Sequence, residues 1–117
     1  MKILKQYSEF VKVPNGLELL KLIELAGRTC YKSEDKITED SSKVFVKKII
    51  ESGHHSVLEH ANVSVRFVTD RGVTHEIVRH RIGLALSQES SRYCNYSKDK
   101  FGNEITVILP VWFQEEA

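Results

Sequence analysis

The sequence has few residues that cross-link a chain or break its secondary structure, with two cysteines, two prolines and six glycines among 117 residues. Cys30 and Cys94 are far apart and belong to no CxxC pair, so we expect two reduced thiols rather than a disulfide. No apolar run approaches the ~20 residues that cross a bilayer, and the first residues lack the apolar core and cleavage site of a secretion signal. These absences predict a soluble, cytosolic protein without a membrane partner.

Neither sign of charge dominates the sequence. Lys and Arg total 17 against 16 for Asp and Glu, and 41% of the residues are hydrophobic. This balance is typical of a globular chain and argues against disorder. A net charge of +1 also argues against a nucleic-acid polymer as partner, because such binding depends on a large cationic field. The remaining nucleic-acid hypothesis is binding of a single strand, with bases stacked on Tyr93 and Tyr96 and a phosphate bound by Arg92.

Strand and helix patterns interleave along the chain without regular βαβ spacing. Apolar residues at helical intervals and period-two alternation predict the elements, and Gly27 is expected to end the first helix. Helices are expected at residues 17–26, 41–51 and 71–81, and strands at residues 1–13, 63–67, 84–86 and 105–109. We therefore predict a single domain of the α+β class, with a mostly antiparallel sheet packed against helices.

The five histidines fall in two stretches, residues 53–60 and 74–81. His55, Glu59 and His60 have the spacing H-x-x-x-E-H, whereas zinc proteases need H-E-x-x-H or H-x-x-E-H to place two ligands on one helical face. The cysteines supply no second pair of ligands. The spacing therefore predicts no metal site.

The second stretch is rich in cations. On a helix, Arg71, His75 and Arg79 would form one stripe, and the consecutive Arg79, His80 and Arg81 would fan out about 100° apart. Arginine offers planar, bidentate donors to phosphate, so this arrangement suits a ligand with several anionic oxygens, such as a nucleotide.

A purely structural interpretation competes with the nucleotide one. Cations in the last turn of a helix offset its dipole for ~0.3–1 kcal/mol, and Glu76 has the spacing to pair with Arg79 or His80. The residues that follow favour the nucleotide, because they add hydroxyl, amide and guanidinium donors. These donors are Ser87, Gln88, Ser90, Ser91 and Arg92.

Two motifs together resemble a known family. Arg79-His80-Arg81, followed by Ser90 and Arg92-Tyr93, resembles the signature of the flavin-dependent thymidylate synthases, the thymidylate synthase-complementing proteins. Residues 53–60, GHHSVLEH, resemble that family's Gly-His-x-Ser/Thr-x-x-Glu-His segment. The matches have the right order and separation, and the resemblance extends over most of residues 26–96.

The resemblance implies a homotetrameric enzyme that methylates dUMP to dTMP with methylenetetrahydrofolate, FAD and NADPH. It implies FAD-binding roles for His54, Ser56, Glu59, Arg79, His80 and Arg81. It implies dUMP-binding roles for Glu76, Arg79, Gln88, Glu89, Ser90, Ser91 and Arg92. No residue receives a certain catalytic role, and His54 is the one candidate.

The chain departs from the family pattern in three places. Eight residues rather than seven separate Arg81 from Ser90, which a bulge at Gly83 would absorb. Glu76 stands where some members carry an amide. The arginine that polarises uracil comes from a C-terminal half that residues 1–117 do not include, so we expect an N-terminal portion that is inactive alone. The alternative is a non-catalytic flavin- or nucleotide-binding or assembly module.

Overall fold

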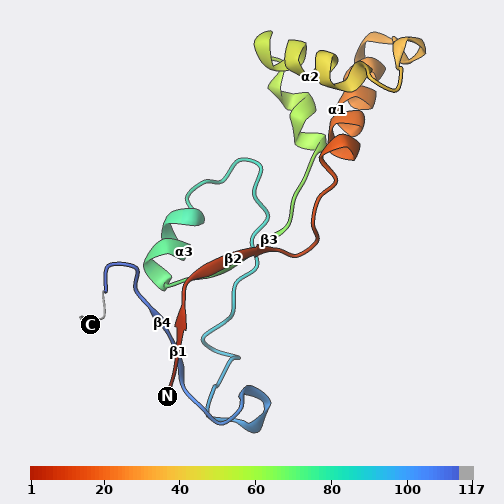
Figure 1. Ribbon diagram of the computed structural model, residues 1–117. Coiled ribbons are helices and arrows are strands. Elements are labelled where there is room, and N and C mark those ends of the chain that lie inside the picture. The colour runs from red at the N-terminus through yellow and green to blue at the C-terminus, as the bar shows by residue number, and fades with distance from the viewer. Residues whose placement is uncertain (114–117) are drawn as a thin grey trace. The chain divides into compact units, whose positions relative to one another are not determined.

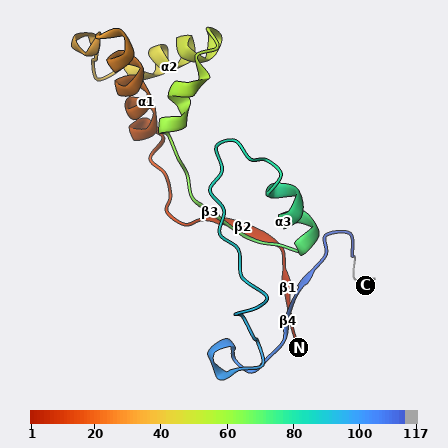
Figure 2. The same cartoon turned by 180° about the vertical axis from the view of Figure 1, so that it is seen from behind.

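The computed structural model describes residues 1–113, which form two compact units. One unit comprises Met1–Glu9 and the described residues from Arg66 on, and the other comprises Phe10–Val65. Each unit is built from short elements that the ribbon drawings show from two sides (Figures 1 and 2). Among the described residues, no helix has the length and apolarity needed to cross a bilayer.

The first unit contains most of the strands. Strand β1 (Lys2–Lys5) pairs in parallel with β4 (Thr106–Leu109), with Lys2 opposite Thr106. Strand β2 (Tyr7–Phe10) pairs with β3 (Val65–Val68), which leads into helix α3 (Arg71–Ile77), as Figure 1 shows. A short 3-10 helix, η3 (Asp99–Phe101), precedes β4.

The α+β class is confirmed, but a mostly antiparallel sheet is not. The strands form two separate two-stranded sheets, and β1 and β4 run parallel. Parallel pairing requires a long crossover, and here the whole chain between residues 5 and 106 supplies it. The prediction that residues 1–117 are the N-terminal portion of one longer domain stays a prediction.

The second unit is helical. Its elements are α1 (Gly16–Tyr31), η1 (Glu34–Lys36), α2 (Ser41–Glu51) and η2 (His55–His60). Its main contact is between α1 and α2, and the buried apolar side chains Ile23, Val46 and Ile49 lie there. The predicted bounds of the second helix are confirmed. Of its apolar side chains, Val46 and Ile49 are buried, whereas Ile50 is exposed.

Helix α1 is longer than the sequence predicted. Asn15 caps its start, since the Asn15 side chain accepts from the Leu17 and Glu18 backbone N–H groups. The prediction that Gly27 ends the helix was wrong: α1 continues to Tyr31, and Lys32 ends it in the left-handed conformation, at φ 48°.

Gly27 serves close packing rather than termination. A Cβ atom added there would lie 2.5 Å from Cε1 of Phe45 on α2. The missing side chain thus lets the Phe45 ring approach the α1 backbone, which explains a glycine in the middle of a helix despite its cost of about 1 kcal/mol relative to alanine.

We expect Gly27→Ala to lower the free energy of unfolding by about 1 kcal/mol. Overpacking against Phe45 costs about 1–3 kcal/mol, and the higher helix propensity of alanine offsets about 1 kcal/mol of this. Gly16→Ala is the matched control, because nothing lies within 4 Å of a Cβ at that position in the same helix. Urea denaturation followed by circular dichroism compares the two variants. A Gly27→Ala protein as stable as Gly16→Ala would contradict the packing role.

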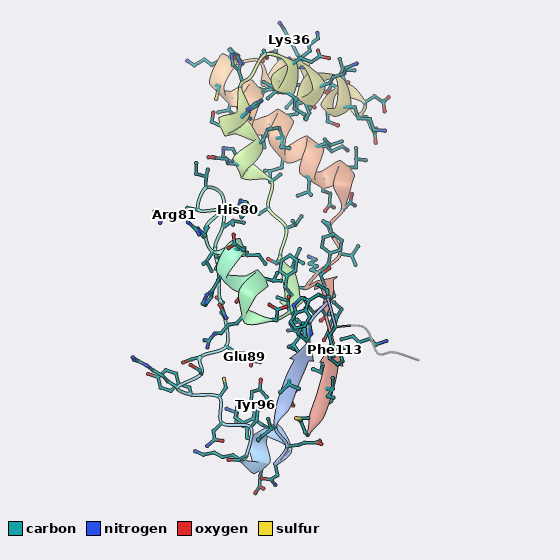
Figure 3. All side chains as sticks on the ribbon, turned by 90° about the vertical axis from the view of Figure 1, so that its left-hand side faces the viewer. Lys36, His80, Arg81, Glu89, Tyr96 and Phe113 are labelled. Carbon is teal, nitrogen blue, oxygen red and sulfur yellow. The ribbon has the colours of Figure 1, made fainter. Side chains whose placement is uncertain are left out.

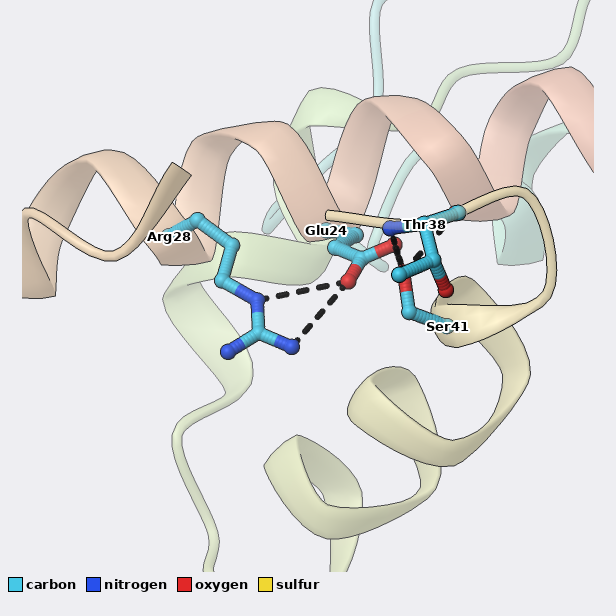
Figure 4. A network of polar contacts seen from close by, with 4 residues as sticks. All are labelled: Glu24, Arg28, Thr38 and Ser41. Carbon is cyan, nitrogen blue, oxygen red and sulfur yellow. Dashed lines mark hydrogen bonds and ion pairs between the residues drawn. The ribbon is translucent and has the colours of Figure 1, made fainter. Parts of the chain in front are cut away.

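A buried polar network joins α1 to the start of α2 (Figure 4). The Glu24 carboxylate is 1% exposed and accepts hydrogen bonds from Nε and Nη2 of Arg28, at 3.3 and 3.2 Å. It also accepts from the Ser41 hydroxyl at 2.9 Å, and Ser41 Oγ in turn accepts from the Thr38 N–H at 2.8 Å. The Arg28 guanidinium lies 4.4 Å from the centre of the Phe45 ring, so one carboxylate orders both helices and the loop between them.

Other predicted elements need correction. The third helix ends at Ile77 rather than Arg81, and residues 84–86 form no strand. Gly83 adopts φ 74° in a turn just before those residues, which interrupts the extended pattern. The strand predicted at residues 63–67 lies at Val65–Val68, and Phe67 is exposed. The β2–β3 sheet has only two strands and is too small to bury its own side chains. Alternation of apolar and polar residues along β3 therefore does not ensure that the apolar ones are buried.

Candidate functional site

The first motif, residues 53–60, lies on η2 and the turn before it. Val57 and Leu58 are its half-buried residues and pack η2 against α1, while His54, Ser56 and Glu59 are exposed. The apolar pair in the middle of the motif therefore anchors the segment, and the polar side chains of the predicted cofactor set remain exposed to solvent.

His54 is held by an aromatic neighbour. The hydroxyl of Tyr31, the last residue of α1, lies 3.0 Å from Nδ1 of His54, and the two rings are stacked with centroids 6.5 Å apart. Both residues line an open cavity of about 470 Å³, together with Phe45, Lys48 and Ile49. A contact of Tyr31 with Nδ1 leaves Nε2 of His54 available for a ligand.

The second motif begins with helix α3. The Asp70 side chain caps the helix by accepting from the Val73 N–H at 3.1 Å, and it also accepts from Nε2 of Gln6 at 2.7 Å. Gln6 accepts in turn from the Thr69 hydroxyl. Gln6, the residue between β1 and β2, therefore helps to orient the Asp70 side chain that caps α3.

The cationic residues 79–81 lie just beyond the end of α3. The backbone N–H groups of Arg79 and His80 donate to the carbonyls of Glu76 and Ile77, at 3.2 and 3.1 Å, so the chain leaves the helix in a tight turn. The predicted single stripe of Arg71, His75 and Arg79 on one helix was wrong, because Arg79 lies outside α3.

The side chains of this turn face solvent. Arg79, His80 and Arg81 are exposed, and Figure 3 shows His80 and Arg81 side by side on the loop after α3. Within residues 1–113, none of the three forms an ion pair. The competing interpretation, in which Glu76 pairs with Arg79 or His80, is thus not seen in the described part of the chain. The cations remain available to an anion.

The donor-rich segment that follows forms a turn. Nε2 of Gln88 donates to the Thr74 hydroxyl of α3 at 3.3 Å, which ties the segment to the helix. The Ser90 carbonyl accepts from the Tyr93 and Cys94 N–H groups, at 3.2 and 2.9 Å, and the Ser90 hydroxyl accepts from the Arg92 N–H at 3.2 Å. This turn leaves the Ser91 and Arg92 side chains exposed.

A further contact closes this segment. The Tyr96 hydroxyl donates a hydrogen bond to Oε2 of Glu89. That bond is the main cause that raises the pKa of Tyr96 to about 12, with smaller contributions from desolvation and from the charges of Glu89 and Cys94. The bond stabilises the neutral phenol beside the carboxylate.

The predicted site residues are divided between the two units. His54, Ser56 and Glu59 lie in the helical unit, whereas Glu76, residues 79–81 and residues 88–92 lie in the other. Among the described residues, no group of three His, Cys, Asp or Glu side chains is placed to hold a metal ion. Sequence reasoning missed the supporting roles of Tyr31 and Tyr96. No periodic pattern marks either residue, because each partner is distant in sequence or lies across a loop.

Comparisons with known proteins find one matching family and several relatives of known name. The sequence profile of the family described as thymidylate synthase complementing protein matches residues 17–117. A flavin-dependent thymidylate synthase of Mycolicibacterium gilvum is 46% identical over 99 residues, which are 81% of this chain and 36% of that protein. The same-named protein of Mycobacterium avium is 46% identical over 93 residues, 76% of this chain and 34% of that protein. The one of Corynebacterium glutamicum is 36% identical over 99 residues, 81% of this chain and 36% of that protein.

The match covers most of this chain but only part of its relatives. The chain spans about a third of the length of these relatives. No solved structure matches it. Since the family profile covers residues 17–117 and includes both motifs, the chain belongs to the thymidylate synthase complementing protein family.

Proposed function

We propose that this chain supplies flavin- and nucleotide-binding residues of a flavin-dependent thymidylate synthase. One observation supports the proposal most strongly. The chain belongs to this family, and the polar side chains of both motifs are exposed on segments that the rest of the fold holds in place. The relatives that cover the same residues are named flavin-dependent thymidylate synthases. We therefore propose for this chain the reaction, the substrate and the cofactor of that family.

The residues present fit a flavin with phosphate groups. Arg79, His80 and Arg81 present exposed donors on one turn, and Arg79 and Arg81 carry permanent positive charge. A dinucleotide such as FAD offers the anionic oxygens that such donors bind. In the helical unit, the proposed flavin contacts are Ser56 and Glu59 on η2 and Nε2 of His54, which lies just before η2 and lines the cavity of that unit.

The turn at residues 88–92 fits a nucleotide monophosphate. The proposed substrate is dUMP, with Ser90 and Arg92 at its phosphate. Arg92 is exposed and forms no ion pair with a described residue, as a phosphate ligand requires. The other proposed dUMP contacts are Glu76, Arg79, Gln88, Glu89 and Ser91.

Catalysis is proposed for the whole protein. The bound flavin would supply hydride transfer, while the residues of this chain bind and orient the two ligands. Methylenetetrahydrofolate and NADPH are the proposed co-substrates, and a homotetramer is the proposed assembly. Self-association is supported by the exposed apolar side chains on α1, Leu22 and Leu25, since exposed apolar patches mark interaction surfaces.

The test is a visible absorption spectrum of the purified chain with FAD, before and after desalting and with or without dUMP. We expect flavin absorbance that stays with the protein and shifts when dUMP is added, because the two ligands would share Arg79. Free FMN, which lacks the second phosphate and the adenosine, is the comparison ligand. Retention of FAD without a dUMP shift would favour a flavin-binding module. A chain that retains no FAD would contradict the proposal for this chain.

A further inference from the structure

The contact between Glu89 and Tyr96 closes a loop around the nucleotide-binding turn. The two residues lie on the chain between α3 and η3, and both are labelled in Figure 3. Between them, the Ser90 carbonyl accepts from the Tyr93 and Cys94 N–H groups. The side-chain hydrogen bond from Tyr96 to Glu89 therefore links the two ends of the segment that carries Ser90, Ser91 and Arg92.

The Tyr96 ring is itself anchored. It packs against Phe101 of η3, with ring centroids 5.1 Å apart and a 51° angle between the planes. Such tilted aromatic pairs are a favoured geometry. The Lys100 ammonium lies 5.6 Å from the centre of the Phe101 ring. The phenol is therefore held from η3, while its hydroxyl reaches the carboxylate.

We propose that Tyr96 is a positioning residue, which holds Glu89 and through it the turn that presents Ser90 and Arg92 to dUMP. This inference rests on the proposed function of the turn. Tyr96 does not touch the ligand in this scheme: its hydroxyl orients the Glu89 carboxylate, and the closed loop keeps the Ser90–Arg92 donors in one arrangement. Preorganised donors bind a ligand more tightly because less ordering is needed on binding.

The protonation state of Tyr96 agrees with this role. The Glu89 carboxylate accepts only from the neutral phenol, so the hydrogen bond raises the pKa of Tyr96 from 10.0 to about 12. The contribution of this bond to stability is complete below pH 10 and is lost as the pH rises through about 12. At neutral pH the loop is closed.

The experiment measures dUMP affinity by titration calorimetry for the full chain, Tyr96→Phe, Glu89→Ala and the double variant. Because Tyr96 acts on dUMP only through Glu89, we expect Tyr96→Phe to lose no more than the net contribution of a typical hydrogen bond, which is about a 3- to 10-fold weaker affinity. If Tyr96 acts through Glu89, the same change made in the Glu89→Ala background should cost no further affinity. Tyr7→Phe on β2 is the matched control and should bind as the wild type does. Additive losses, or an unchanged Tyr96→Phe, would overturn the proposal.

A second measurement separates this inference from the proposed function. Amide hydrogen exchange of Tyr93 and Cys94 reports the turn directly, because both N–H groups donate to the Ser90 carbonyl. We expect Tyr96→Phe to speed their exchange about 3- to 10-fold, with or without dUMP. If the wild type binds no dUMP, the proposed function fails for this chain, and faster exchange in Tyr96→Phe still supports the role of the Tyr96–Glu89 contact in holding the turn. Unchanged exchange would overturn the positioning role in either case.

Discussion

Replacing Glu24 by glutamine should lower the free energy of unfolding by about 3 kcal/mol, the low end of the range for breaking a buried ion pair. The Glu24 carboxylate is 1% exposed and accepts from Arg28 and Ser41. The amide of glutamine carries no charge to compensate the Arg28 guanidinium, whose side chain is only 17% exposed. The largely desolvated Arg28 charge would then lack its partner, and desolvated charges without partners are costly.

The matched control is Glu51→Gln on α2. Glu51 also forms an i,i+4 ion pair, with Lys47 at 3.9 Å, but both side chains are more than half exposed. Exposed pairs of this kind contribute about 0.3–0.5 kcal/mol. Urea denaturation followed by circular dichroism measures both variants. If Glu24→Gln costs no more than Glu51→Gln, the network of Glu24, Arg28 and Ser41 does not stabilise the helical unit.

Replacing Arg81 by glutamine should weaken FAD binding about 10- to 100-fold, which corresponds to one lost hydrogen bond to a charged group. Arg81 is exposed on the turn after α3, and within residues 1–113 it forms no ion pair. Its guanidinium would therefore be free to bind phosphate, and glutamine supplies neither the charge nor the bidentate fork. Flavin fluorescence during a titration of the protein gives the dissociation constant.

The control for Arg81 is Arg66→Gln on β3, which makes the same chemical change in the same unit. Arg66 pairs with Glu9 at 3.4 Å on the surface and lies in neither motif, so we expect unchanged FAD affinity and a loss of stability under about 1 kcal/mol. Equal FAD affinity of Arg81→Gln and the wild type would contradict the assignment of the Arg79–Arg81 turn to the flavin. Equal losses for both variants would indicate a general effect of charge.

Local patterns were sufficient wherever neighbours in sequence decide the structure. The helix at Ser41–Glu51 was predicted from apolar residues at helical intervals, and the strand at Thr106–Leu109 lies within the predicted residues 105–109. The two family motifs could also be recognised from the sequence alone, because the order and spacing of their residues do not depend on the fold. The family match over residues 17–117 agrees with that reading.

Only the tertiary structure decided the features that depend on distant residues. Gly27 looks like a helix end in sequence, but Phe45 packs against it and α1 continues through it. Gln6 donates a hydrogen bond to the capping side chain of Asp70, 64 positions away in sequence, and no local pattern predicts that contact.

The same limit applies to the candidate site. The sequence by itself determined only the candidates, which are the His54–Glu59 segment and the cations at residues 79–81, and their roles stay a prediction. The structure placed those cations on a turn beyond α3 and paired Tyr31 with His54 and Tyr96 with Glu89. A side-chain hydrogen bond or a close packing contact forms only when the tertiary fold brings two distant residues together. The periodicity of the sequence contains no information on which distant residues meet.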